Sequence, residues 1–317
     1  TNPNKRVFDL VLTELDDDIH PFISEGTFDF STGKLYLVAN ETLDVTPASH
    51  VDLSKIVFYN NSGDANRTKI NAVGSTIVES DGLTVTLQLP ESKRHKLYKM
   101  ANQTVNGDGS TLLLTILSGS FHDVAFNDII SSELLVAELP DTKPPGVLGY
   151  TADYSNGLHY ANGSLIITFD ETIDVTPWTF VNASNIFLAD TSGDQRIQLD
   201  GAQVLGTDHP RVTLLLTELQ RVTAIAISNT TGGDGQKIVL DVYPSSVRDL
   251  AGNLNQGLLG LGQTVIEYPD VVPPEVNKID IDFNNGVIRI FVTETVDATP
   301  ANQTADLRKV LIGNNES

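Results

Sequence analysis

The sequence predicts an all-β protein built from tandem antiparallel β-sandwich domains joined by short proline-rich linkers. Short runs that alternate apolar and polar residues are separated by Gly, Asn, Asp and Pro, which is typical of strands and turns. A heptapeptide recurs three times at domain-sized spacing, which indicates tandem units. Only 19% of the 317 residues are charged, and Ser, Thr, Asn and Gly are abundant, which suits sheets with polar turns.

The heptapeptide is the clearest internal repeat. It begins at Glu41, Glu171 and Glu294, and the first copy reads Glu-Thr-Leu-Asp-Val-Thr-Pro. Each copy follows a turn glycine flanked by alternating apolar residues, a pattern that predicts a β-hairpin. In the third copy this hairpin spans residues 279–291 around Asn-Asn-Gly. Because each repeat shows about seven strand-like runs and little helix, each is expected to form one sandwich.

Two paired prolines mark the boundaries between repeats. Pro144-Pro145 and Pro273-Pro274 remove backbone donors, end a strand and stiffen the linker. One segment in each complete repeat, Glu91–Met100 and Leu219–Ile227, predicts a short helical or irregular crossover. The expected division is a last strand of a preceding repeat, two complete repeats and the first part of a third, covering 1–15, 16–143, 144–272 and 273–317.

This division places the ends of the chain out of register with its repeats. One interpretation is that the sequence is an excerpt of a longer chain, and this is the favoured one. The other is that subunits complete each other head to tail by donating strands. The two ends together lack the counterpart of roughly residues 65–128, which argues against complete mutual complementation.

Three motifs in order carry a family resemblance. They are the Asp-x-x-Pro-Pro-x-Val joint, the segment 169–176 after a hairpin, and the loop 247–253, which reads Val-Arg-Asp-Leu-Ala-Gly-Asn. Together they resemble bacterial immunoglobulin-like (Ig-like) repeats of S-layer proteins and large cell-surface adhesins. The resemblance implies Ig-like sandwiches that serve as spacers, adhesive modules or lattice units. The first repeat departs from the pattern, because Phe126 stands where the loop glycine is expected.

Acidic residues recur near the joints and the two loops that meet at one pole of an Ig-like sandwich. Converging carboxylates suit Ca²⁺, which takes six to eight oxygen ligands. The alternative is that these residues only stabilise turns, because Asp side chains bond nearby backbone amides. The candidate calcium ligands at the inter-domain joints are Asp17, Glu41, Asp44, Asp123, Asp141, Glu171, Asp174 and Asp249.

Composition excludes several classes of protein. The net charge of −21 disfavours nucleic acid and anionic membranes as partners. The absence of cysteine excludes disulfides and cysteine-based metal sites, and no apolar run is as long as a membrane-spanning helix. Nine Asn-x-Ser/Thr sequences predict covalent N-glycans, at Asn40, Asn60, Asn66, Asn102, Asn162, Asn182, Asn229, Asn302 and Asn315.

The sequence predicts no catalytic residue, no organic cofactor and no enzyme activity. Six histidines are scattered without a His-Glu-x-x-His pattern, and neither a Gly-x-Ser-x-Gly elbow nor a phosphate-binding glycine loop occurs. The basic run 93–96 is expected to be a solvated loop face. Trp178 is expected to be a half-buried residue at a pole rather than a sugar-stacking platform.

These observations predict a structural repeat protein of an extracellular filament or cell-surface layer. Its expected partners are copies of itself in a head-to-tail homopolymer, with no nucleic acid and no membrane insertion within these residues. The alternative is an adhesin stalk or module that binds a glycan or protein through its loop ends.

Overall fold

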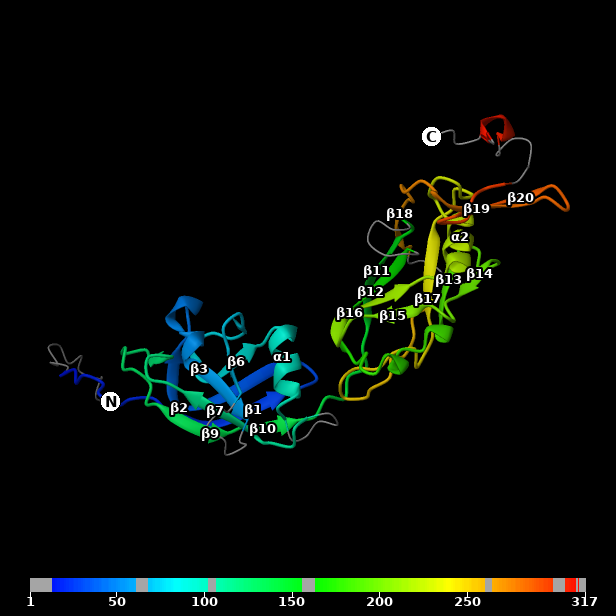
Figure 1. Ribbon diagram of the computed structural model, residues 1–317. Coiled ribbons are helices and arrows are strands. Elements are labelled where there is room, and N and C mark those ends of the chain that lie inside the picture. The colour runs from blue at the N-terminus through cyan, green and yellow to red at the C-terminus, as the bar shows by residue number, and fades with distance from the viewer. Residues whose placement is uncertain are drawn as a thin grey trace, which may run out of the picture. The chain divides into compact units, whose positions relative to one another are not determined.

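A computed structural model of the chain describes residues 13–60, 68–101, 107–155, 163–259, 264–298, 306–311 and 313. The chain separates into two compact units, Thr1–Lys143 and Pro144–Ser317, each considered by itself below (Figure 1). Strands dominate both units, and the helices of the described residues are short. The all-β prediction is therefore confirmed. Of the predicted segment 1–15, residues 1–12 lie outside the described residues, and the rest shows no regular element.

The first unit is a sandwich of two sheets. One has the strand order β10-β1-β2-β6-β5 with β8 against β2, and the other has the order β4-β3-β7-β9. The strands are β1 (Ile23–Asp29), β2 (Lys34–Asp44), β3 (Ile56–Asn60), β4 (Lys69–Asn71), β5 (Thr76–Ile77), β6 (Gly82–Gln88), β7 (Leu112–Ile116), β8 (His122–Asp123), β9 (Ser132–Leu135) and β10 (Ala137–Leu139).

The second unit repeats this arrangement with the sheets β15-β16-β12-β11-β18 and β14-β13-β17. The strands are β11 (Val147–Asp153), β12 (Ser164–Ile173), β13 (Ile186–Asp190), β14 (Arg196–Gln198), β15 (Gln203–Leu205), β16 (His209–Leu215), β17 (Ile238–Val242) and β18 (Ile266–Tyr268).

The strand order of both units is that of an Ig-like sandwich. In the first unit β1, β2, β5 and β6 share one sheet, and β3 and β7 share the other. In the second unit β11, β12, β15 and β16 share one sheet, and β13 and β17 share the other. One pairing in each unit departs from the predicted antiparallel pattern, because β1 pairs with β10, and β11 with β18, in parallel. The first and last strands of each sandwich run in the same direction, so they can pair only in this way.

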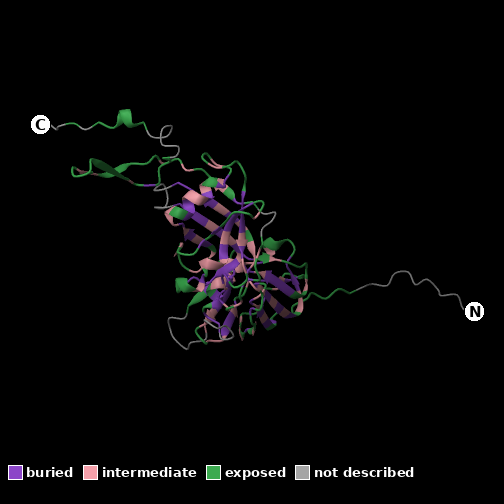
Figure 2. Cartoon of the chain, turned by 90° about the vertical axis from the view of Figure 1, so that its right-hand side faces the viewer, coloured by how far each residue is buried: buried purple, intermediate pink, exposed green. Residues whose placement is uncertain are grey.

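The core of each sandwich follows the period-two alternation of its strands. In the second strand of each hairpin, Leu35 and Leu37 are fully buried in the first unit, as are Leu165 and Ile167 in the second. Figure 2 shows buried residues alternating with partly buried ones along the strands of the sandwiches. Burying each such side chain contributes about 1.5–3 kcal/mol, so the spacing of apolar residues selects the face that turns inward.

The predicted crossovers are confirmed as two short helices, α1 (Glu91–Tyr98) and α2 (Glu218–Ala226). Pro90 precedes α1, and its fixed φ suits the first turn. At the start of α2, Thr217 and Gln220 form a reciprocal capping box that satisfies two backbone donors. Helix α1 connects β6 to β7 and helix α2 connects β16 to β17, so the two helices occupy matched places in the two repeats.

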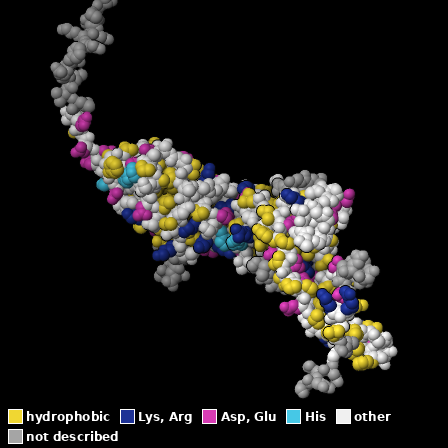
Figure 3. Space-filling model, turned by 90° about the horizontal axis from the view of Figure 1, so that it is seen from above, with side chains coloured by type: hydrophobic (Ala, Val, Ile, Leu, Met, Phe, Trp, Pro, Cys, Tyr) yellow, Lys and Arg dark blue, Asp and Glu magenta, His cyan; other side chains and the backbone are white. Residues whose placement is uncertain are grey.

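The third repeat contributes the predicted hairpin, formed by β19 (Val276–Asp282) and β20 (Val287–Val292). Gly286 adopts a positive φ of +69° in its turn, and the turn glycines of the other repeats, Gly33 and Gly163, also have positive φ. Ile288 and Ile290 occupy the positions of Leu35 and Leu37, yet they are 37% and 43% exposed. Figure 3 shows hydrophobic side chains at the surface in this part of the chain. A short 3₁₀ helix (Leu307–Lys309) follows.

Candidate functional site

The pole of each sandwich is built from the end of its heptapeptide and the loop before its last strands. The Thr–Pro bond of the heptapeptide is cis in both complete repeats and leads into a 3₁₀ turn, at Ala48–His50 in the first and Trp178–Phe180 in the second. The loop lies beside the heptapeptide, because Leu43 pairs with Asp123 and Ile173 with Asp249. Acidic residues distant in sequence therefore meet at this pole.

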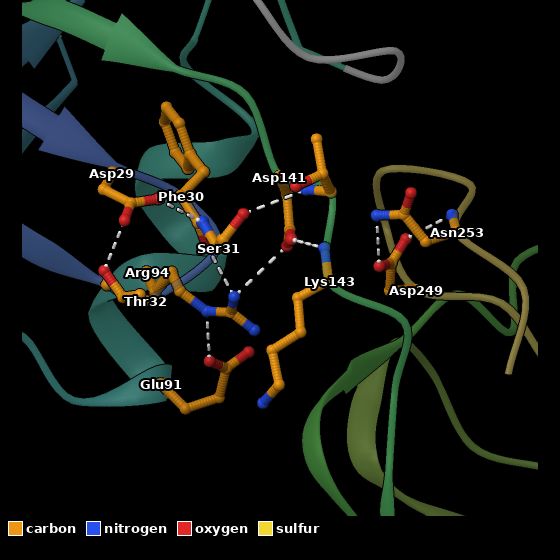
Figure 4. Close-up of polar contacts among 12 residues, drawn as sticks. Asp29, Phe30, Ser31, Thr32, Glu91, Arg94, Asp141, Lys143, Asp249 and Asn253 are labelled. Atoms are coloured by element: carbon orange, nitrogen blue, oxygen red, sulfur yellow. Dashed lines mark hydrogen bonds and ion pairs between the residues drawn. The ribbon is translucent and has the colours of Figure 1, made fainter. Parts of the chain in front are cut away.

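The loop aspartates hold their turns through side-chain hydrogen bonds. Asp123 Oδ1 accepts from the backbone N–H groups of Ala125 and Asn127, both at 2.8 Å. Asp249 accepts from Asn253 in the same way, which Figure 4 shows. Burial acts to raise the pKa of Asp123, but the hydrogen bonds from Asn127 and Ala125, with the neighbouring His122, outweigh it and hold this pKa below its ordinary value.

Three predicted calcium ligands of the first sandwich converge. Carboxylate oxygens of Asp17, Glu41 and Asp123 lie within 4.8 Å of one another. All three donors are hard oxygens, which suits Ca²⁺. Both carboxylate oxygens of Asp123 already accept hydrogen bonds from its own loop, so the fit to an ion is partial. The calcium assignment therefore stays a prediction.

Asp44 lies apart from that group. Its Oδ2 lies 2.9 Å from Nδ1 of His50 and 3.7 Å from Nδ1 of His122. In the second sandwich the matching aspartate, Asp174, instead accepts two hydrogen bonds from the guanidinium of Arg248, at 2.7 and 3.1 Å. That guanidinium also stacks on the ring of Phe180. A protein cation therefore neutralises Asp174, while imidazoles surround Asp44.

The remaining predicted ligands divide between the units. Glu171 and Asp249 belong to the second unit, are buried and lie within 4.8 Å of each other. Asp141 belongs to the first unit, where Arg94 Nη1 donates to its Oδ2 at 3.2 Å. Asp141 also accepts from the backbone N–H of Lys143, which fixes the chain at the end of the unit.

A buried arginine is the central group at the other pole of each sandwich. In the first unit Arg94, from α1, donates to Glu91 at 2.6 Å, to the carbonyl oxygen of Phe30 at 2.6 Å and to Asp141 (Figure 4). Only 8% of Arg94 is exposed, so the prediction of a solvated basic face over residues 93–96 is wrong for this residue. The carboxylates of the helix and the joint compensate the cost of burying its charge.

The second unit forms the same group around Arg221, whose side chain is 2% exposed. Arg221 donates to Glu218 of α2 at 2.8 and 2.9 Å, to Asp270 of the joint at 2.5 Å and to the carbonyl oxygen of Tyr154 at 3.1 Å. It also reaches Glu294 of the third heptapeptide at 3.0 Å. The second sandwich and the third repeat therefore share one buried charge cluster.

The pKa values of two carboxyl groups in this cluster shift in opposite directions. Burial and the nearby Asp270 raise the pKa of Glu294, although Arg221 opposes them. Burial also acts on Glu218, but hydrogen bonds from Arg221 and Thr295 outweigh it and lower that pKa. The guanidinium itself stays charged, since its partners raise an already high pKa.

Sequence reasoning missed this arginine cluster, although a signal was present. Both helices carry Glu and Arg three residues apart, Glu91 with Arg94 and Glu218 with Arg221, which are neighbours on a helix surface. The spacing recurs at matched places in the two repeats, so the alignment of the repeats could have found it. Burial of the arginines could not be read from the pattern, because the same spacing is common on solvated helices.

The described sequons lie on accessible segments. Asn40, Asn182 and Asn229 are exposed, while Asn60 is partly buried and donates to Asp108 at 3.1 Å. The other predicted glycosylation positions lie outside the described residues, namely Asn66, Asn102, Asn162, Asn302 and Asn315. Exposure makes attachment sterically feasible at the first three positions, and glycosylation itself stays a prediction.

Trp178 differs from its predicted environment. It was expected to be half-buried, but 66% of it is exposed, because it begins the 3₁₀ turn after the cis proline and points out of the core. It lines a groove with Asn182, Asp200 and Gln203. An exposed tryptophan beside polar side chains is an arrangement that can stack on a sugar ring.

Comparisons with known proteins give distant structural likeness alone. No protein-family model and no curated protein matches the chain. Among solved structures, the S-layer protein rSbsC(31-844) is 12% identical with a TM-score of 0.28, over 83% of this chain and 27% of that one. Titin A168169 is 10% identical with a TM-score of 0.26, over 79% and 99%.

The chain thus spans about a quarter of the S-layer structure that it matches. Scores at this level carry no argument about function, so the Ig-like assignment rests on the strand order of the two sandwiches. Among the described residues, no helix has the length and hydrophobicity needed to cross a bilayer.

Proposed function

We propose that this chain is a structural segment of an extracellular filament or cell-surface layer, assembled from copies of itself and N-glycosylated. The observation that carries the proposal is the Arg221 cluster. One buried guanidinium ties the helix of one repeat, the joint and the heptapeptide of the next repeat together. A protein that transmits shape or load along tandem repeats needs joints held in this way, whereas independent binding modules do not.

The third-repeat hairpin carries an apolar sheet face that further strands are expected to cover. The positions of Ile288 and Ile290 are fully buried in both complete sandwiches but exposed here. In a complete sandwich this face packs against the second sheet, so it is expected to contact further strands, whether these belong to the same chain or to another copy. The net charge of −21 would keep such an assembly soluble and would favour divalent cations around it.

Electron microscopy of the native material, with and without a calcium chelator, tests the proposal. Fibres or sheets with an axial repeat set by whole domains are the expected result, and softening on chelation would support calcium at the poles. Glycopeptide mass spectrometry of the same material should find sugar on exposed sequons such as Asn182. Monodisperse rods at high concentration would contradict the filament.

A second candidate is an adhesin stalk or module that binds a glycan or a protein. The groove beside Trp178 favours it, because an exposed indole with nearby polar groups suits a sugar ring. A glycan array probed with the fluorescently labelled chain separates the two candidates. Trp178→Ala should abolish any glycan binding and leave assembly intact.

A further inference from the structure

Three side chains at the pole of the first sandwich form a group that the proposed function does not use. Asp44 ends β2, His122 begins β8 directly across the sheet from it, and His50 ends the 3₁₀ turn that follows the cis proline. Ligand atoms from all three lie within 4.8 Å of one another. The three residues come from separate parts of the chain, so the fold itself brings them together.

We propose that Asp44, His50 and His122 bind a divalent transition-metal ion such as Zn²⁺. Imidazole and carboxylate are ligands that zinc and its neighbours accept, whereas Ca²⁺ prefers oxygen alone. Tetrahedral zinc with bonds of about 2.0–2.1 Å places its ligand atoms about 3.3 Å apart. The distances from Asp44 Oδ2 to the two Nδ1 atoms, 2.9 and 3.7 Å, bracket this separation.

In the second sandwich the matching positions contain a cation of the protein itself. There Asp174 pairs with Arg248, which stacks on Phe180. These residues match Asp44, His122 and His50 in turn. A guanidinium is always charged, so it neutralises the buried aspartate without help. A neutral imidazole carries no charge that could balance Asp44. A bound cation would supply the positive charge that Arg248 supplies in the second sandwich.

Phe126 gives the first site a cover that the second lacks. Its ring lies 5.0 Å from that of His122 and 6.4 Å from that of His50, between centroids. Phe126 adopts φ +69°, a conformation that disfavours a bulky residue, and Gly252 fills the matching position with φ +86°. An apolar ring over the imidazoles excludes water and strengthens metal–ligand interactions.

An ion can reach the site. The side chains of His50 and His122 are 31% and 18% exposed, while that of Asp44 is 11% exposed. Nδ1 of His122 also lies 3.0 Å from the carbonyl oxygen of Asp123. Binding through Nδ1 would exchange that contact for the metal bond, and any proton on the nitrogen would pass to solvent.

The test is calorimetric titration of the tag-free 317-residue chain with ZnCl₂, supported by the visible spectrum of the Co²⁺ form. We expect one Zn²⁺ bound at this site. The double variant His50→Phe with His122→Arg, which installs the residues of the second sandwich, should weaken binding at least tenfold. Asp44→Asn should weaken it as well, and it provides a second route if the double variant does not fold.

Two control variants locate the ion. His209→Asn removes an exposed histidine, and Glu41→Gln alters the neighbouring acidic group; both should retain native zinc affinity. A chain that binds no Zn²⁺ overturns the proposal. Binding that survives in the folded double variant, or that is lost in Glu41→Gln, would also overturn it, because the ion would then sit elsewhere.

Discussion

At the residue scale, matched positions in two repeats show what each side chain does. The loop position of Phe126 and Gly252 has the same left-handed backbone in both sandwiches, so the fold requires that conformation whichever residue is present. Glycine adopts it without strain, whereas phenylalanine does so at a cost of about 1 kcal/mol or more. Phe126 is 71% exposed, so burial of its side chain offsets little of the backbone strain.

We therefore expect Phe126→Gly to raise the free energy of unfolding of the first sandwich by about 1 kcal/mol. The reciprocal change, Gly252→Ala, should destabilise the second sandwich by about 1 kcal/mol. A Cβ at Gly252 meets nothing within 4 Å, so this cost comes from the backbone alone. Calorimetry follows the first change and Trp178 fluorescence the second. A destabilised Phe126→Gly chain would show that the ring contacts outweigh the strain.

At the element scale, helix α2 stabilises the joint as well as the sandwich that contains it. Arg221 is buried among three carboxylates, and its removal leaves Glu218, Asp270 and Glu294 without their shared cation. Breaking a buried charge pair in this way costs about 3–5 kcal/mol. The lowered pKa of Glu218 and the raised pKa of Glu294 indicate that the cluster stabilises the ionised form of Glu218 and disfavours that of Glu294.

Arg221→Ala should therefore lower the free energy of unfolding of the second sandwich by about 3–5 kcal/mol, measured by urea titration with Trp178 fluorescence. The exposed Arg211 provides the control, since Arg211→Ala should change stability by no more than about 0.5 kcal/mol. Equal losses of stability in the two variants would contradict the stabilising role of the buried guanidinium.

Glu294→Gln tests the raised pKa of that carboxyl. The pKa of Glu294 is higher in the folded protein than in the unfolded chain, so folding favours the protonated form. The contribution of Glu294 to the free energy of unfolding is therefore lost as pH rises through the folded pKa. Glutamine mimics the protonated form and does not titrate. The variant should gain stability relative to the native chain at neutral pH, and the difference should shrink as pH falls below the raised pKa. A pH-independent difference would contradict the shift.

At the scale of the whole molecule, the described residues form two closed sandwiches and the hairpin of a third repeat. The closed units bury the inward face of their hairpins, whereas the hairpin of the third repeat presents that face to solvent. Such a face lowers its free energy when further strands cover it, whether they come from the same chain or from another copy. The acidic charge sets an opposing long-range repulsion that salt screens.

Ile288→Ser with Ile290→Ser should weaken self-association, because serine removes apolar area that contact would bury. Sedimentation velocity at several protein concentrations measures the change. Val124→Ser with Leu254→Ser, at exposed loop positions of the closed sandwiches, is the matched control and should leave association unaltered. Association that persists at full strength in the hairpin variant would place the contact on another surface.

The all-β class, the tandem repeats and the third hairpin could be predicted from the sequence. The reason is local: strand period, turn glycines and the recurring heptapeptide are all written along the chain. Acidic residues at the poles could be anticipated for the same reason, since motif order indicates which loops meet.

Which charged groups share an environment depends on the tertiary structure, and the sequence did not predict it. The fold places Asp44 beside His50 and His122, whereas Glu41, only three residues away in the sequence, lies beside Asp17 and Asp123. It buried Arg94 and Arg221, which the sequence cannot distinguish from solvated helix residues. It also exposed Trp178 and brought His50 against His122. Burial and pairing depend on packing between distant segments, and local pattern carries no record of that packing.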